Sequence, residues 1–145
     1  YKRQVMQILQ GLAKTLMKYQ DPQSGTWYQV TDQGAREGNY LESSATALFI
    51  YTLAKAVNKG YISKDYIEPT RKAFDGMVKT FTRLEEDGSY TITNCCAVAG
   101  LGGDSKRYRD GSFEYYISEP VIENDPKSVG SFILAAIEYE KMTDK

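Results

Sequence analysis

The sequence predicts an all-α chain that forms an arc of a larger ring of helices. Three observations support this fold class: four segments carry apolar residues at helical spacing, charged helices alternate with nearly uncharged ones, and both uncharged helices follow polar loops. A ring with an outer and an inner layer of helices requires this alternation, because inner helices are covered on most sides. Four helices cannot close such a ring, so we expect open apolar edges.

The first helix is expected over 2–20, where apolar residues line one face and basic or amide side chains line the other. Pro22 and Gly25 end it, since proline cannot continue a helix and glycine suits a turn. Residues 26–30 form a short β-prone stretch, expected to be half of a small hairpin. A polar loop follows over 31–38.

The second helix is expected over 42–58, with Asn39 or a nearby polar residue as its N-cap. It has no charged side chain between Ser43 and Ala54, which is typical of an inner helix. The third helix, over 64–83, has a charged outer face that we interpret as solvated surface, with partner binding as the alternative. Its Pro69 lies near the start, where a missing amide is tolerated.

The second half of the chain repeats the pattern of the first. A strand is expected over 89–93, followed by a long glycine-containing loop over 94–123, and such loops are usually functional or mobile. The fourth helix is expected over 127–142. Its packed residues are predicted to be Val129, Phe132, Ile133, Ala136 and Ile137. Aligning Ser43 with Ser128 gives a repeat of roughly 85 residues, or two αα-hairpins.

Composition excludes several classes of function. The 145 residues fit a single domain, 1–145, and the net charge of −1 favours neither nucleic-acid binding nor a polybasic membrane anchor. No apolar run approaches the roughly 20 residues that a bilayer requires. The chain has no histidine, and its two cysteines, Cys95 and Cys96, are adjacent, so we predict neither a disulfide between them nor a metal site. Acid–base catalysis here would have to rest on carboxylates.

Six segments, in order and covering nearly the whole chain, resemble the unsaturated glycuronyl hydrolases. The resemblance is to the unsaturated rhamnogalacturonyl hydrolases of glycoside hydrolase family 105 and, more distantly, to family 88. The segments are 25–30 (GTWYQV), 39–44 (NYLESS), 59–61 (KGY), 99–103 (AGLGG), 109–116 (RDGSFEYY), and 124–125 (ND) leading into 129–135 (VGSFILA).

The resemblance implies an (α/α)6 barrel of twelve helices, of which these are the last four. It implies an enzyme of pectin degradation that removes a 4,5-unsaturated uronic acid from rhamnogalacturonan-type oligosaccharides, without a metal or organic cofactor. In that family an aspartate hydrates the sugar's double bond, and the resulting hemiketal collapses. The family's catalytic aspartate lies earlier in the barrel and no residue here matches it, so we assign no catalytic residue and expect this segment alone to be inactive.

The expected partners are therefore an unsaturated uronide oligosaccharide and the remaining N-terminal part of the barrel. Such a pocket opens where loops lead into the inner helices, and helix N-termini favour anions. We accordingly predict a substrate-binding rim, with helix capping and turn formation as the alternative for the asparagines and aspartate. Its members are Asn39, Glu42, Asn124, Asp125 and Lys127.

Four further residues complete the predicted substrate-binding set. Trp27, the single tryptophan, stacks on a sugar ring or packs in the interior. Arg109 binds a substrate carboxylate, or forms a surface ion pair with Asp110. Ser112 follows them in the same loop. Two other functions remain open at this point: a non-catalytic helical module that binds carbohydrate or protein, and a plain array of helical hairpins.

Overall fold

The computed structural model describes residues 1–34, 36–103 and 108–144. Its long helices are α1 (Lys2–Tyr19), α2 (Ser43–Asn58), α3 (Ile67–Phe81) and α5 (Pro126–Thr143), and α4 (Phe113–Ser118) is a short helix between α3 and α5. The strands β1 (Thr82–Leu84) and β2 (Tyr90–Ile92) form one antiparallel pair. The strands β3 (Cys95–Cys96) and β4 (Val121–Ile122) form another. Two 3-10 turns, Thr31–Gln33 and Lys64–Tyr66, complete the elements.

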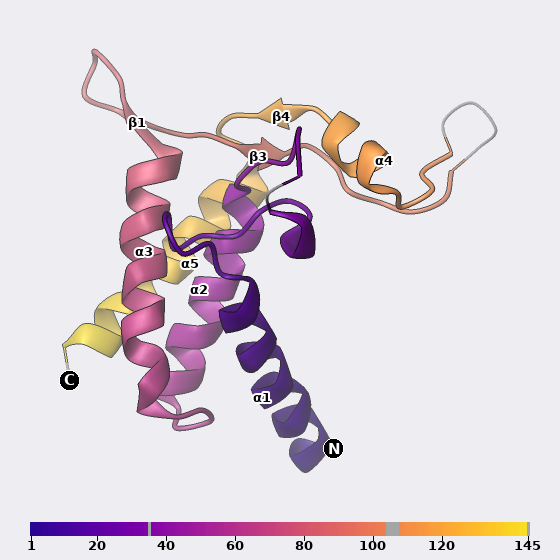
Figure 1. Cartoon of the computed structure of the whole chain (residues 1–145). Coiled ribbons are helices and arrows are strands. Elements are labelled where there is room, and N and C mark those ends of the chain that lie inside the picture. Colours follow the sequence, from indigo (N-terminus) through magenta and orange to yellow (C-terminus); the bar gives the residue numbers. More distant parts are fainter. Residues whose placement is uncertain (35, 104–107, 145) are drawn as a thin grey trace.

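The two helices with few charges, α2 and α5, pack against each other, and α3 packs against both. Figure 1 shows that α2 and α5 begin at the same end of the molecule, beside β3 and β4, whereas α1 and α3 run the opposite way. This arrangement confirms the prediction that the two inner helices present their N-termini on one side. It follows that the loops entering these helices lie close together in space.

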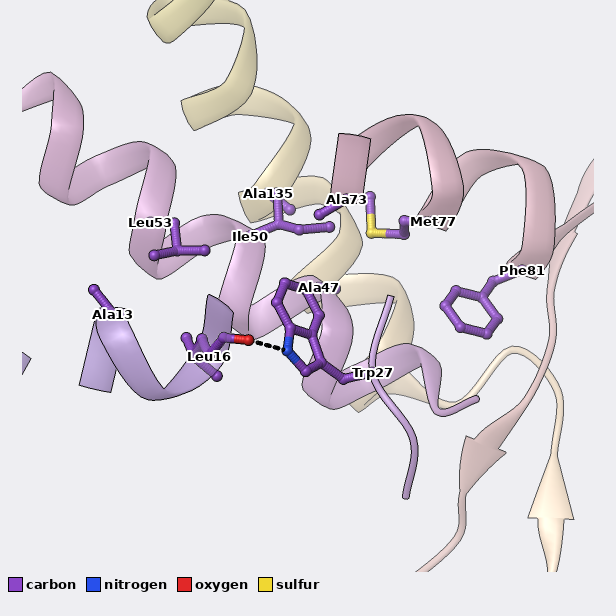
Figure 2. Packing of buried hydrophobic residues seen from close by; sticks show 10 residues of the cluster. All are labelled: Ala13, Leu16, Trp27, Ala47, Ile50, Leu53, Ala73, Met77, Phe81 and Ala135. Atoms are coloured by element: carbon purple, nitrogen blue, oxygen red, sulfur yellow. Dashed lines mark hydrogen bonds between the residues drawn. The ribbon is translucent and has the colours of Figure 1, made fainter. Parts of the chain in front are cut away.

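The buried core lies where α1, α2, α3 and α5 meet, as Figure 2 shows. Trp27 is at its centre, completely buried, and its indole N–H donates to the Leu16 carbonyl at 2.9 Å. The Phe49 ring meets the indole edge to face, with 5.4 Å between centroids. The segment that carries Trp27 approaches α3 so closely that a Cβ on Gly76 would lie 1.8 Å from the Ser24 carbonyl oxygen. Glycine is therefore required at this position of α3.

Apolar side chains remain exposed along two edges of the helical array. Val5 and Ile8 on α1 are 59% and 71% exposed, and Ile133 and Ile137 on α5 are 55% and 44% exposed. The prediction that Ile133 and Ile137 pack inside was wrong for this chain, because they lie on a side of α5 that none of its described helices covers. These edges are what an arc of a larger ring leaves open.

Several boundaries differ from those predicted. The third helix begins with the separate 3-10 turn Lys64–Tyr66 and ends at Phe81, where β1 follows. The stretch 26–30 forms only an isolated bridge between Tyr28 and Leu41 instead of a hairpin strand. The segment 94–123, predicted as a loop, contains β3, α4 and β4. None of the described helices is both long enough and apolar enough to span a membrane.

Candidate substrate-binding site

The N-terminus of α2 is closed by the carboxylate of Glu42, so the N-cap is a polar residue near Asn39, as the prediction allowed, and not Asn39 itself. Glu42 is 2% exposed. One of its oxygens accepts from the Ala45 backbone N–H at 2.7 Å, and the other accepts from the Ser44 hydroxyl at 2.9 Å and the Cys96 N–H at 3.0 Å. A buried carboxylate is stable only when its oxygens are hydrogen-bonded in this way.

The N-terminus of α5 is closed in a similar way by Asp125, whose side chain is partly exposed (14%). Its carboxylate accepts from the Lys127 N–H at 2.8 Å and from the Lys127 ammonium at 2.7 Å. This pairing with Lys127 lowers the pKa of Asp125 and raises that of Lys127. The Lys127 side chain is half exposed and also donates to the Ala97 carbonyl at 3.1 Å.

A single stretch of chain, residues 91–97, joins the two helix starts, and we call it the rim segment. On the α2 side, the Ser43 N–H donates to the Asn94 carbonyl at 3.0 Å, and the Cys96 N–H donates to Glu42. On the α5 side, Lys127 holds Ala97. The rim segment therefore brings Glu42, Asp125 and Lys127 to one end of the molecule, and their contact with a substrate stays a prediction.

The two predicted asparagines shape loops. Asn39 accepts from the Val30 N–H at 3.2 Å and donates to the carbonyls of Val30 and Gln33 at 2.9 and 2.8 Å. Asn124 has a positive φ of 51°, and its side-chain oxygen accepts from the Ile92 N–H at 2.8 Å. These contacts match the alternative of turn formation, and direct sugar contact by either amide stays a prediction.

Trp27 does not belong to the rim. Because its side chain is completely buried and its N–H is bonded to Leu16, the indole presents no face to a sugar. The stacking role was wrong, and the packing alternative holds. Tryptophan is often buried when its N–H finds a partner, as here.

Arg109, Asp110 and Ser112 lie in the segment between the rim segment and β4, which extends beyond the helices at the end where α2 and α5 begin (Figure 1). The Arg109 Nε lies 4.0 Å from a carboxylate oxygen of Glu119. Asp110 instead accepts from the Ser112 N–H at 2.8 Å, which lowers the pKa of Asp110. Ser112 caps α4 by accepting from the Tyr115 N–H at 3.1 Å. The suggested pair between Arg109 and Asp110 is thus replaced by separate partners.

Sequence reasoning missed two charged residues of this region. The side chain of Glu119 is fully buried beside Arg109, and full burial is rare for glutamate. Arg36 pairs with Glu114 and lies over the Phe113 ring, 3.8 Å from its centroid, so the 31–38 loop is braced against α4. The one sequence signal near these residues is the capping pattern Ser112-Phe113-Glu114, which indicates the start of α4 and not the burial of Glu119.

The two cysteines belong to the rim segment, and both are buried. Cys95 and Cys96 are both free and buried, and burial raises the pKa of Cys95. The amide of Gln29 donates to the Cys96 sulfur at 3.2 Å. Within the described part of the chain, no group of three histidine, cysteine, aspartate or glutamate side chains is placed to hold a metal ion.

Comparison with known proteins identifies the class of protein to which this fold belongs. The helical array is part of the α/α barrel of a glycoside hydrolase. The chain belongs to glycosyl hydrolase family 88, whose family model matches residues 1–143.

Two curated relatives are similar at the sequence level. Protein Atu3128 of Agrobacterium fabrum is 39% identical over 120 residues, which cover 80% of this chain and 52% of the relative. The 24.9 kDa protein in the picA locus of Rhizobium radiobacter matches with the same identity and coverage. The chain thus spans about half the length of the curated relatives that it matches.

Solved structures of glycoside hydrolase family 105 share the fold. The family 105 glycoside hydrolase of C. acetobutylicum superimposes with a TM-score of 0.89 at 44% identity, over 93% of this chain and 37% of that chain. A possible member of family 105 from Salmonella enterica gives 0.76 at 29% identity, over 98% of this chain and 32% of that chain. This chain therefore corresponds to about a third of each solved chain.

Proposed function

We propose that this chain is the last third of an (α/α)6 barrel in an unsaturated glycuronyl hydrolase. The enzyme would remove a 4,5-unsaturated uronic acid from rhamnogalacturonan-type oligosaccharides by hydrating the double bond of that sugar. The observation that supports this proposal is the pair of inner helices, α2 and α5, whose N-termini are joined by the rim segment at one end of the array. Membership of family 88 supplies the reaction class.

In this proposal the chain supplies the aglycone side of the pocket and the preceding helices supply the catalytic aspartate. At the rim, Glu42 and Lys127 are each bonded to the rim segment, and Asp125 is bonded to Lys127. The two carboxylates are therefore not a pair of free carboxylates. Free carboxylates on both sides of a glycosidic bond are what an ordinary glycosidase needs. The rim fits substrate binding better than acid–base catalysis, and it leaves that step to residues outside this chain.

The apolar edges favour an enzyme segment over an independent binding module. Ile8 on α1 and Ile133 on α5 are more than half exposed on two different helices, so each edge fits a further helix. A module that worked alone would have to keep both edges in water.

The test is an ultraviolet assay on the protein that joins this chain to the preceding helices of the barrel. Unsaturated rhamnogalacturonan oligomers from a lyase digest are the substrate, and hydration of the 4,5-double bond removes its absorbance. We expect absorbance to fall with the complete barrel and to stay constant with the 145-residue chain alone. Constant absorbance with the complete barrel on every unsaturated uronide tested would refute the proposal.

A further inference from the structure

The segment that carries Arg109 is a built polar cluster and not a free loop. Gly102 and Arg109 form an antiparallel bridge, with N–H to carbonyl distances of 2.9 and 3.0 Å in the two directions. The Tyr115 hydroxyl accepts from the Gly100 N–H at 3.0 Å, which ties the same segment to α4. The backbone of Arg109 is therefore held against Gly102.

The side chain of Arg109 is held as well. Its Nε is 4.0 Å from Glu119, whose side chain is fully buried, while about a third of the Arg109 side chain (32%) is exposed. A Cβ on Gly100 would lie 3.0 Å from a terminal nitrogen of Arg109, so the guanidinium lies directly over that glycine. Burial and the neighbouring Glu119 carboxylate raise the pKa of Tyr115, which agrees with a compact cluster of these groups.

Among the predicted site residues, Arg109 is the best candidate for binding an anion, because the other positive groups already have partners. One first-turn amide of each inner helix is already bonded to its capping carboxylate, Glu42 or Asp125, and the Lys127 ammonium is bonded to Asp125. A guanidinium has five N–H donors in a planar fork, and one carboxylate beside Nε cannot satisfy them all. Donors on the two terminal nitrogens match the two oxygens of a second carboxylate.

We propose that Glu119 is a positioning residue for Arg109. It holds Arg109 so that the terminal nitrogens of the arginine bind a carboxylate in the aglycone of the substrate. This inference rests on the proposed function. The aglycone is the part concerned because the segment of Arg109 extends past the starts of α2 and α5, away from the helical array (Figure 1). A side chain that is already fixed loses less rotamer entropy on binding. The buried carboxylate therefore improves affinity without touching the sugar.

The test compares two unsaturated substrates in the complete barrel, one with a uronate in the aglycone and one with a neutral aglycone. The variants are Arg109→Ala, Glu119→Gln and the double variant. For Arg109→Ala we expect KM for the acidic aglycone to rise about tenfold more than KM for the neutral one, as expected for losing a charge-assisted hydrogen bond. Glu119→Gln should move the same ratio by a smaller factor, with no further rise in the double variant.

Two outcomes would overturn the inference. One is a rise in KM for both aglycones alike in Glu119→Gln, and the other is an effect of Glu119→Gln that persists in the Arg109→Ala background. Should Glu119→Gln fail to fold, Gly100→Ala serves instead, since its methyl group pushes on the guanidinium and leaves Glu119 in place. It should raise the same KM ratio, and an unchanged ratio would count against the inference.

A binding measurement separates this inference from the proposed reaction. Calorimetric titration with a saturated oligogalacturonate and with its methyl ester needs no turnover. Preferential binding of the acid form that Arg109→Ala abolishes and Glu119→Gln weakens would support the cluster even if no double bond is hydrated. Equal binding of acid and ester, or binding of neither, would overturn it.

Discussion

Replacing Glu42 by glutamine should weaken the chain more than any comparable change at a helix start. The substitution keeps the shape of the side chain but exchanges one acceptor oxygen for an NH2 group. Both oxygens of Glu42 accept from backbone N–H groups, one from Ala45 and one from Cys96. Whichever way the glutamine amide turns, its NH2 faces an N–H, and one buried backbone donor loses its partner.

The magnitude follows from these bonds. A buried hydrogen bond to a charged group contributes about 1.5–3 kcal/mol. Losing one such bond and weakening the others should lower the free energy of unfolding by about 3 kcal/mol. For a chain of this size that corresponds to a fall of roughly 6–12 °C in Tm.

Trp27 provides the assay. It is the only tryptophan and is completely buried, so its fluorescence reports unfolding in urea directly. The matched control is Asp125→Asn, which removes a charge from the N-cap of the other inner helix, where the carboxylate is partly exposed and accepts from one backbone N–H. Hydrogen exchange at residues 94–97 should speed up in Glu42→Gln and not in Asp125→Asn. A loss in Glu42→Gln no larger than in the control would show that the carboxylate does not hold the rim segment.

Three further predictions concern glycine, pH and the open edges. Gly76→Ala should lower the free energy of unfolding by about 1–3 kcal/mol, because its Cβ would meet the Ser24 carbonyl. Gly11→Ala, at an open position of α1, should raise it by about 0.5–1 kcal/mol, and equal effects in urea unfolding would contradict the packing. The pKa of Asp125 is lowered in the folded chain, so its contribution is complete above the ordinary value of 3.8 and is lost as the pH falls through the lowered pKa. The difference in urea midpoint between the wild type and Asp125→Asn should therefore shrink in acid, and a difference that grows there would refute this sign. Finally, the chain alone should self-associate through its apolar edges, and Ile133→Glu with Ile137→Glu should shift it toward monomer in sedimentation velocity. The same change at exposed Leu84 and Tyr90 is the control, and an equal shift there would place the association elsewhere.

The helices could be predicted from the sequence because their periodicity is local. Apolar spacing and end signals predicted 2–20 and 42–58, and the structure has Lys2–Tyr19 and Ser43–Asn58. The absence of charge between Ser43 and Ala54 also identified α2 as an inner helix. These signals lie within one element, so no knowledge of distant contacts was needed.

The parts that depend on distant contacts could not be predicted in this way. Trp27 is buried in the core with its N–H bonded to Leu16 on another element, and no pattern around residue 27 shows that environment. Ile133 was predicted inside, because periodicity identifies an apolar face without showing what covers it. The burial of Glu119 depends on a fold of the 97–120 segment that its glycines do not specify.

The rim changes how a carboxylate sugar would be recognised by this barrel. A helix N-terminus ordinarily attracts an anion through its free amides and dipole. Here α2 and α5 are capped by the chain's own carboxylates, Glu42 and Asp125, each of which accepts from one first-turn amide, and the Lys127 ammonium is bonded to Asp125. A uronate that approached either helix start would meet a carboxylate that already caps the helix. With the Lys127 ammonium bonded to Asp125, recognition of an acidic aglycone falls to a cation outside the helix ends, and Arg109, held over Gly100 and beside Glu119, has the geometry to provide it.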